Sequence, residues 1–245
     1  MDLSSTEEQV QLRDSVRRLL DKVSGPEAVR AAEDAGHDPS IISGLAEIGA
    51  FSMGLPESLG GFDASLSDLA VVATEAGSHL AMAPVVEALV AGRVLASASR
   101  SADLGDWIES VASGGRLVTF APRPTLCGIA DLVPGGAVAD AVVALDGVEL
   151  VLVAPSEGAT TRVPNTAGTA IGDVDLARLA ERVVLASGDA ATRPNFRAAT
   201  PTSFPTSTPT SFPTRWGCVP RASLAERISA GQSPFVGPVS RKNRG

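Results

Sequence analysis

Apolar residues recur at three- and four-residue intervals through the first 115 positions, the spacing that places them on one face of an α-helix. Five helices are predicted there, over residues 5–23, 38–49, 65–80, 84–95 and 104–111. Turn residues rich in Gly and Pro separate them, as at residues 55–62. We therefore predict an all-helical N-terminal domain over residues 1–115.

Three of these helices have a recognisable first turn. Their starting pairs are Ser5 with Glu8, Ser65 with Asp68, and Asp38 with Pro39. In the first two pairs a hydroxyl and a carboxylate can each bond the other residue's backbone N–H, which is the capping box. In the third, the aspartate caps the helix and the proline presets the backbone angle of its first residue.

The hydrophobic period changes after residue 115. Short runs rich in Val and Leu, broken by Gly, Pro and Asp, are typical of strands. They cover residues 116–121, 141–145, 148–154 and 182–186. Asp146-Gly147 predicts a two-residue hairpin turn, since both residues tolerate positive φ angles. We predict a small antiparallel β domain over residues 116–192, and hence an α+β fold class.

The regular pattern ends near residue 192. A Pro-Thr-Ser motif recurs at Pro201, Pro205 and Pro209, and repeated proline removes amide donors and prevents helix formation. Residues 193–245 are therefore predicted to be an irregular or disordered tail. The charge balance changes at the same point. The tail holds eight basic residues and one acidic residue, whereas residues 1–192 hold 12 basic and 27 acidic residues.

The net charge of the chain is −8, divided into −15 on residues 1–192 and +7 on the tail. The acidic first part has no basic stripe that could displace counterions from phosphates, which excludes nucleic acid as a partner. A change of reading frame near codon 192 would also produce so abrupt a switch, and tandem repeats favour slippage. That hypothesis stays open beside a genuine tail.

Metal and membrane chemistry are both disfavoured. Two Cys and two His cannot complete a Cys-only zinc site, so we expect no metal. The most apolar stretch, residues 80–98, contains Glu87 and Arg93 and is predicted to be a buried helix rather than a membrane span. The N-terminus lacks the positive and apolar segments of a signal peptide, so the predicted location is the cytoplasm.

Several conspicuous residues are interpreted as structural. Gly60-Gly61 predicts a turn with unusual backbone angles rather than a phosphate cradle, because no strand precedes it and no Lys follows it. Glu75 is expected to be solvated or paired, and His37 to be exposed. Trp107 is expected to pack in the core.

The order of motifs along residues 1–190 resembles the acyl-CoA dehydrogenase family. In that family a helix ending in Leu-Gly leads to a Pro-Glu turn, a double glycine, a helix with Glu-Glu-Leu-Gly, a proline, and a β domain with Ala-Asp before a strand. The matching segments are Leu45–Gly49, Leu55–Glu57, Gly60-Gly61, Thr74–Gly77, Pro84 and Val133–Val143. Each segment alone is weak evidence for the family, and the resemblance rests on the order in which the segments occur.

The resemblance implies a flavoprotein that removes a proton from Cα and a hydride from Cβ of an acyl-CoA thioester, with FAD as the hydride acceptor. It also implies a homo- or hetero-oligomer of acyl-CoA dehydrogenase-like subunits. The family's catalytic base is a Glu in, or packed against, a C-terminal four-helix domain. The tail stands in place of that domain, so we assign no catalytic residue and expect a truncated chain that is not catalytically complete alone.

The family's flavin loop typically contains Thr-Glu-Pro followed by Gly-Ser-Asp. Aligned on Phe120-Ala121, this chain has Pro122-Arg123-Pro124 instead, and Pro122 offers neither a hydroxyl nor an amide donor. The cofactor-binding residues that the resemblance leaves are Phe120, Ala121, Pro124 and Gly128.

Two functions remain open from the sequence. The first is an FAD-dependent acyl-CoA dehydrogenase homologue that acts on fatty or sterol side-chain acyl-CoA. The second is a non-catalytic partner subunit or pseudo-enzyme that packs against a complete acyl-CoA dehydrogenase chain. The departures in the flavin loop favour the second function, and the order of motifs favours the first.

Overall fold

The computed structural model describes residues 5–188 and 191, which form helices followed by two small sheets. The helices are α1 Glu7–Val23, α2 Pro26–Ala32, α3 Pro39–Glu47, α4 Leu66–Ser78, α5 Val85–Ala98 and α6 Gly105–Ala112, with a 3-10 turn at Glu57–Leu59. The strands are β1 Val118–Phe120, β2 Ile129–Val133, β3 Ala141–Asp146, β4 Glu149–Pro155, β5 Thr160–Arg162, β6 Gly172–Asp175 and β7 Leu179–Ser187. This order confirms the predicted α+β fold class. The predicted tail, residues 193–245, lies outside the described residues.

The first helix begins one residue later than Ser5 predicts. Thr6 Oγ1 accepts from Gln9 N at 3.2 Å, and Gln9 Oε1 accepts from Thr6 N at 3.2 Å. The Gln9 side chain also donates to Asp68 Oδ1 at 2.9 Å, and Asp68 shares the predicted capping box of α4 with Ser65. The hydrogen bonds from Gln9 and Ser65 lower the pKa of the Asp68 carboxyl. The N-termini of α1 and α4 are therefore joined through Gln9 and Asp68, two of the residues that cap them.

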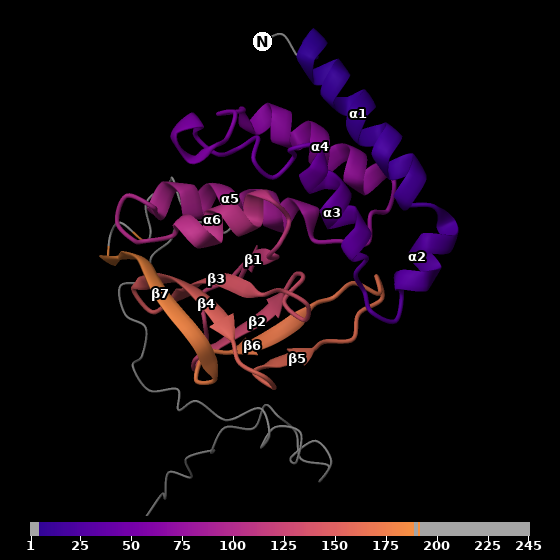
Figure 1. Cartoon of the computed structure of the whole chain (residues 1–245). Helices are drawn as coiled ribbons and strands as arrows, with labels where there is room; N and C mark the ends of the chain where they lie inside the picture. Colours follow the sequence, from indigo (N-terminus) through magenta and orange to yellow (C-terminus); the bar gives the residue numbers. More distant parts are fainter. Residues whose placement is uncertain (1–4, 189–190, 192–245) are drawn as a thin grey trace, which may run out of the picture. The chain divides into compact units, whose positions relative to one another are not determined.

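The helices form two layers above the strands in Figure 1, with α1 and α4 outermost and α5 and α6 next to the sheet. Amphipathic faces of α1, α3 and α4 bury one apolar cluster together with the first half of α5. Its fully buried members include Leu20, Leu45 and Val72. The second half of α5 and the face of α6 belong to a different cluster, which continues into the strands.

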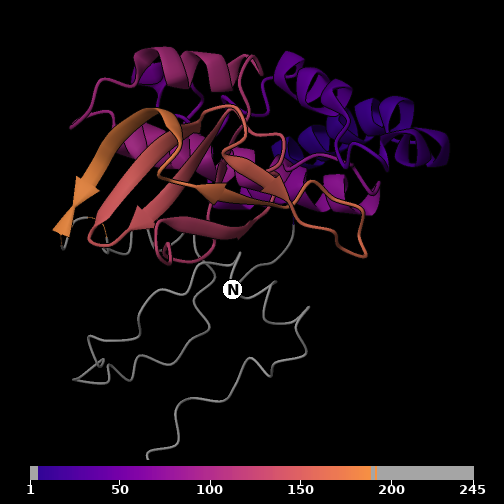
Figure 2. The same cartoon turned by 90° about the horizontal axis from the view of Figure 1, so that it is seen from below.

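The strands form a four-stranded sheet in the order β1-β3-β4-β7 and a three-stranded sheet in the order β2-β6-β5 (Figure 2). The strand pairs are antiparallel, as predicted, except that β1 runs parallel to β3. The reason is that the chain forms β2 in the other sheet between β1 and β3, so it returns in its original direction.

The four-stranded sheet is covered on both faces. Along β3, Val143 joins the cluster under α5 and α6, while Val142 and Ala144 join the cluster between the two sheets. In β4, Leu152 and Val153 divide between the same two clusters. Because alternate side chains of a strand point to opposite faces, this double burial explains why β3 and β4 are almost continuously apolar.

The hairpin between β3 and β4 differs from the prediction by one residue. Asp146 is paired with Glu149, which leaves Gly147 and Val148 as the two turn residues. Gly147 supplies the positive φ angle, 62°, that a tight hairpin turn needs at its first position. The hairpin itself is confirmed, and Asp146 becomes the last residue of the strand.

Candidate functional site

The predicted flavin loop is the segment that joins β1 to β2, residues 121–128. Phe120 ends β1 and packs, partly buried, against the cluster under α5 and α6. Ala121 is buried between the two sheets. Pro124 is exposed, and Gly128 lies in the turn before β2 with a φ of 76°. One connection therefore brings the four predicted residues together, but the side chains of Phe120 and Ala121 belong to separate cores.

Three backbone donors of this loop bond within the chain. The donor and acceptor pairs are Ala121 N to Val143 O, Thr125 N to Leu145 O and Leu126 N to Ile129 O, at 2.8, 2.8 and 2.9 Å. Pro122 and Pro124 have no N–H at all. Five of the six positions from 121 to 126 therefore have no uncommitted amide to offer a ligand.

Polar side chains of the loop are also engaged by the β domain. Thr125 Oγ1 donates to Asp146 Oδ1 at 2.7 Å, and Arg182 Nη2 donates to the other oxygen of that carboxylate at 3.3 Å. Arg123 forms an exposed ion pair with Asp131 at 3.1 Å. Such a surface pair contributes little stability, so the Thr125 and backbone bonds are what hold the loop in place.

The loop can be tested against the flavin edge that the resemblance implies. A flavin edge takes hydrogen bonds from hydroxyl and amide donors, and this loop has proline at two of the three corresponding positions, Pro122 and Pro124. The residues present do not fit that part of an FAD site. The assignment of Phe120, Ala121, Pro124 and Gly128 to the cofactor stays a prediction.

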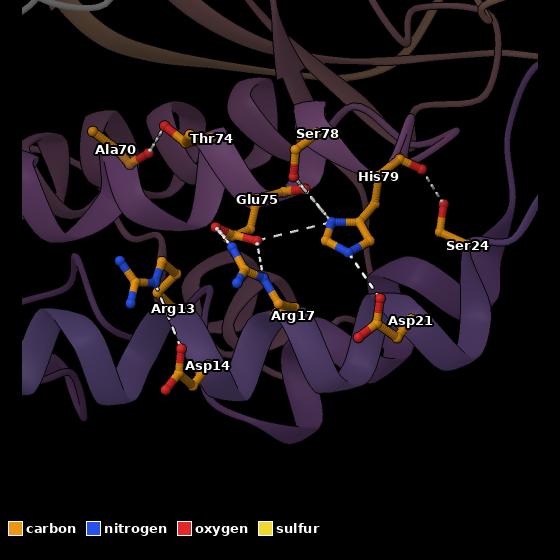
Figure 3. A network of polar contacts seen from close by, with 10 residues as sticks. All are labelled: Arg13, Asp14, Arg17, Asp21, Ser24, Ala70, Thr74, Glu75, Ser78 and His79. Carbon is orange, nitrogen blue, oxygen red and sulfur yellow. Dashed lines mark hydrogen bonds and ion pairs between the residues drawn. The ribbon is translucent and has the colours of Figure 1, made fainter.

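A network of polar side chains ties α1 to α4 (Figure 3). Glu75 is only 4% exposed and accepts from Arg17 Nε at 3.1 Å and Arg17 Nη2 at 3.0 Å. His79 contacts Asp21 Oδ1 through Nε2 at 3.1 Å and the Glu75 carbonyl through Nδ1 at 2.8 Å. The expectation of a paired Glu75 is confirmed. Its bidentate pairing with Arg17 satisfies a buried carboxylate and gives it a structural role.

His37 is half-buried, contrary to the expectation that it is exposed. It lies between α2 and α3, where the backbone N–H of Asp38 donates to the Met82 carbonyl at 2.6 Å. Within residues 5–188, His37 Nδ1 is buried and has no hydrogen-bond partner. Burial lowers the pKa of His37, and the Asp38 carboxylate opposes that shift.

Acidification is expected to destabilise the protein through His37. Its folded-state pKa is lowered, so below the ordinary histidine pKa the unfolded chain takes up a proton that the folded chain resists. The stability lost between pH 7 and pH 5 should therefore be smaller in a His37→Gln variant than in the parent, by a small margin since Asp38 partly compensates. Thermal unfolding midpoints at both pH values measure this difference, and an equal loss in the two proteins would contradict it.

Comparison with known proteins finds similarity to acyl-CoA dehydrogenases. Residues 6–115 match the family model for the acyl-CoA dehydrogenase N-terminal domain. Acyl-CoA dehydrogenase IpdE2 of Mycolicibacterium smegmatis is 35% identical over 145 residues, which are 58% of this chain and 43% of that relative. The chain thus spans less than half the length of the curated relatives that it matches.

Solved structures give the same result for the fold. The ChsE4–ChsE5 complex of Mycobacterium tuberculosis is 26% identical, with a TM-score of 0.67 over 78% of this chain and 60% of that chain. A variant of the Tcur3481–Tcur3483 steroid ACAD is 24% identical, with a TM-score of 0.67 over 79% and 60%. Among the described residues, no helix combines the length and the apolar character that crossing a membrane requires.

Proposed function

We propose that this chain, whose residues 6–115 match the family model for the acyl-CoA dehydrogenase N-terminal domain, is an acyl-CoA dehydrogenase-like subunit that works in an oligomer with a complete acyl-CoA dehydrogenase chain. The partner supplies the FAD site and the catalytic base, and this chain does not oxidise acyl-CoA by itself. The loop over residues 121–128 carries the proposal, since three of its amides bond within the chain and two of its residues are proline. Residues 1–115 and 116–192 serve as its helical and β domains.

The structural relatives support the use of a partner. The name of the ChsE4–ChsE5 structure describes a complex of two proteins, and that of the Tcur3481–Tcur3483 structure also joins two. The second name includes the word steroid, which supports sterol side-chain acyl-CoA as the substrate class of the oligomer proposed for this chain. Fatty acyl-CoA is the other class that the resemblance allows. The cytoplasm is the proposed location of this oligomer.

FAD-dependent α,β-dehydrogenation by this chain alone is the second candidate function. The observation that favours it is the 35% identity over 145 residues to a curated relative named acyl-CoA dehydrogenase IpdE2. The two candidates differ in one measurable property, the affinity of the isolated chain for FAD.

The isolated full chain is expected to be colourless and to take up no FAD. The physical reason is that the loop offers a flavin edge few donors, and an unmade hydrogen bond to a polar ring costs about 1–3 kcal/mol. Titration with FAD, followed by gel filtration and a visible spectrum of the protein peak, measures the uptake. Coexpression with a complete acyl-CoA dehydrogenase chain should give a yellow complex that contains both chains.

A Pro122→Thr, Arg123→Glu variant serves as the matched comparison, because it rebuilds the family's Thr-Glu-Pro sequence in this loop. Any flavin uptake should be higher in this variant than in the parent, alone or in the complex. Stoichiometric FAD binding by the isolated parent chain would overturn the proposal and favour the second candidate. If the coexpressed acyl-CoA dehydrogenase chain purifies without this chain, that result would overturn the partner role.

A further inference from the structure

A cavity of about 550 Å³ lies between the C-terminal half of α5 and the loop that follows α3. Its polar lining consists of Arg93 and Arg100, Asp63, and the hydroxyls of Ser58, Ser97 and Ser99. This volume falls within the range of small-molecule sites. No residue of the loop over 121–128 lines the cavity, so it is separate from the predicted flavin loop.

Arg93 is held in place at one side of the cavity. Its side-chain stem passes over Gly54, where a built Cβ would lie 3.2 Å from Arg93 Cγ. Its Nη1 group donates to the Ala64 carbonyl at 3.1 Å and to the Gly54 carbonyl at 3.4 Å. A guanidinium has five N–H groups, so within the described residues the three on Nε and Nη2 are left for a ligand. A fixed guanidinium of this kind suits an anion.

Arg100 provides a second cation, in the turn that follows α5. The charge of these two arginines contrasts with that of residues 1–192 as a whole, which together carry a net charge of −15.

Serine hydroxyls add donors along the cavity wall. Ser97 Oγ donates to the Arg93 carbonyl at 2.9 Å, and Ser99 Oγ donates to the Ala96 carbonyl at 2.8 Å. These are bonds within a helix that an O–H group can exchange for a bond to a ligand by rotation. Guanidinium and hydroxyl donors together match the oxygens of a phosphate group.

Asp63 distinguishes the cavity from a site for a simple anion. Its backbone is fixed by a bond from Asp63 N to the Leu55 carbonyl at 2.9 Å, with a φ of 52°. A carboxylate repels a bare phosphate and accepts a hydrogen bond from a hydroxyl. The cavity thus presents donors for a phosphate and an acceptor for a neighbouring hydroxyl.

We propose that this cavity binds a phosphate ester that carries free hydroxyl groups, as a sugar phosphate or the ribose phosphate of a nucleotide does. Arg93 and Arg100 bind the phosphate oxygens, and Asp63 accepts from a hydroxyl of the ester. The site requires neither FAD nor a partner chain, so its test is independent of the function proposed above.

Calorimetric titration of the full chain with ribose 5-phosphate, inorganic phosphate and ribose tests the site. Ribose 5-phosphate should bind at least about fivefold more tightly than inorganic phosphate, and ribose should give no heat. An Arg100→Gln variant should bind ribose 5-phosphate about fivefold more weakly, the loss expected for one partly solvated charge pair. Arg18→Gln, which removes the same charge from an exposed position on α1, should leave the affinity unchanged.

Asp63→Asn tests the selectivity, and asparagine tolerates the positive φ of this position. This variant should bind inorganic phosphate more tightly than the parent and should lose most of the preference for the ester. Equal binding of ribose 5-phosphate by the parent and by Arg100→Gln would overturn the proposal. So would the absence of heat with the ester, or an unchanged preference in Asp63→Asn.

Discussion

Gly61→Ala is expected to destabilise the protein by more than about 4 kcal/mol, an exceptional cost for the addition of one methyl group. A Cβ at this position would lie 2.1 Å from the carbonyl oxygen of Leu55 and 2.4 Å from its carbonyl carbon. The obstacle is backbone, which cannot rotate away. The Leu55 side chain is 1% exposed and belongs to the core under α5, so moving it would disturb that core as well.

Gly60→Ala is the matched control, because it adds the same methyl group one residue earlier. Nothing lies within 4 Å of a Cβ at Gly60, whose φ of 77° is the sole obstacle. A left-handed backbone costs an alanine about 1–2 kcal/mol. Urea unfolding of both variants measures the difference. A Gly61→Ala variant that is as stable as Gly60→Ala would mean that the turn relaxes easily, contrary to this prediction.

The double glycine also shows how far sequence reasoning can go. The prediction of a turn with unusual backbone angles is confirmed for Gly60. Gly61 needs a glycine for a different reason, the close approach of the Leu55 carbonyl. No local pattern encodes that contact, because Gly61 and Leu55 meet only when the turn has formed.

Elements with strong local signals were predictable, and elements that depend on distant partners were not. Asp38 caps α3 as expected, with Oδ1 accepting from Ser40 N at 2.9 Å. Strand β2 was missed, since its alternation is broken at Leu132, which has a φ of 50°. The Leu132 N–H donates to Asp173 Oδ1 at 2.8 Å, and Asp173 is a buried acid in β6. Strand β6 was not predicted either, because its polar residues do not give the apolar pattern of a strand.

The candidate sites follow the same division. Pro122 identifies from sequence alone that the flavin loop lacks a donor. The amide bonds to Val143 and Leu145 involve a strand about twenty residues away and required the fold. Arg93 entered the sequence argument only as a charge that excludes a membrane span, because its carbonyl partners are 29 and 39 residues distant.

Trp107→Ala is expected to cost about 3–5 kcal/mol, the range for removing a large aromatic side chain from a core. Trp107 is 7% exposed and lies on α6 in the cluster that continues into β3, β4 and β7. Its Nε1 donates to Glu181 Oε1 of β7 at 3.3 Å, and the Arg116 guanidinium stacks 4.4 Å from the ring centroid. This residue therefore joins the helical region to the strands.

The Trp107→Ala variant also tests whether the proposed helical and β domains, divided at residue 115, unfold together. Since one core contains side chains from both sides of that boundary, helices and strands should unfold in a single transition in the parent and in the variant. Circular dichroism measures the cost, and hydrogen exchange over residues 85–98 and 141–155 reports each side separately. Trp107→Phe keeps most of the apolar contact and should lose only about 1 kcal/mol with the indole hydrogen bond. Loss of exchange protection in the strands alone, with the helices intact, would show instead that the two regions are stable independently and that Trp107 does not couple them.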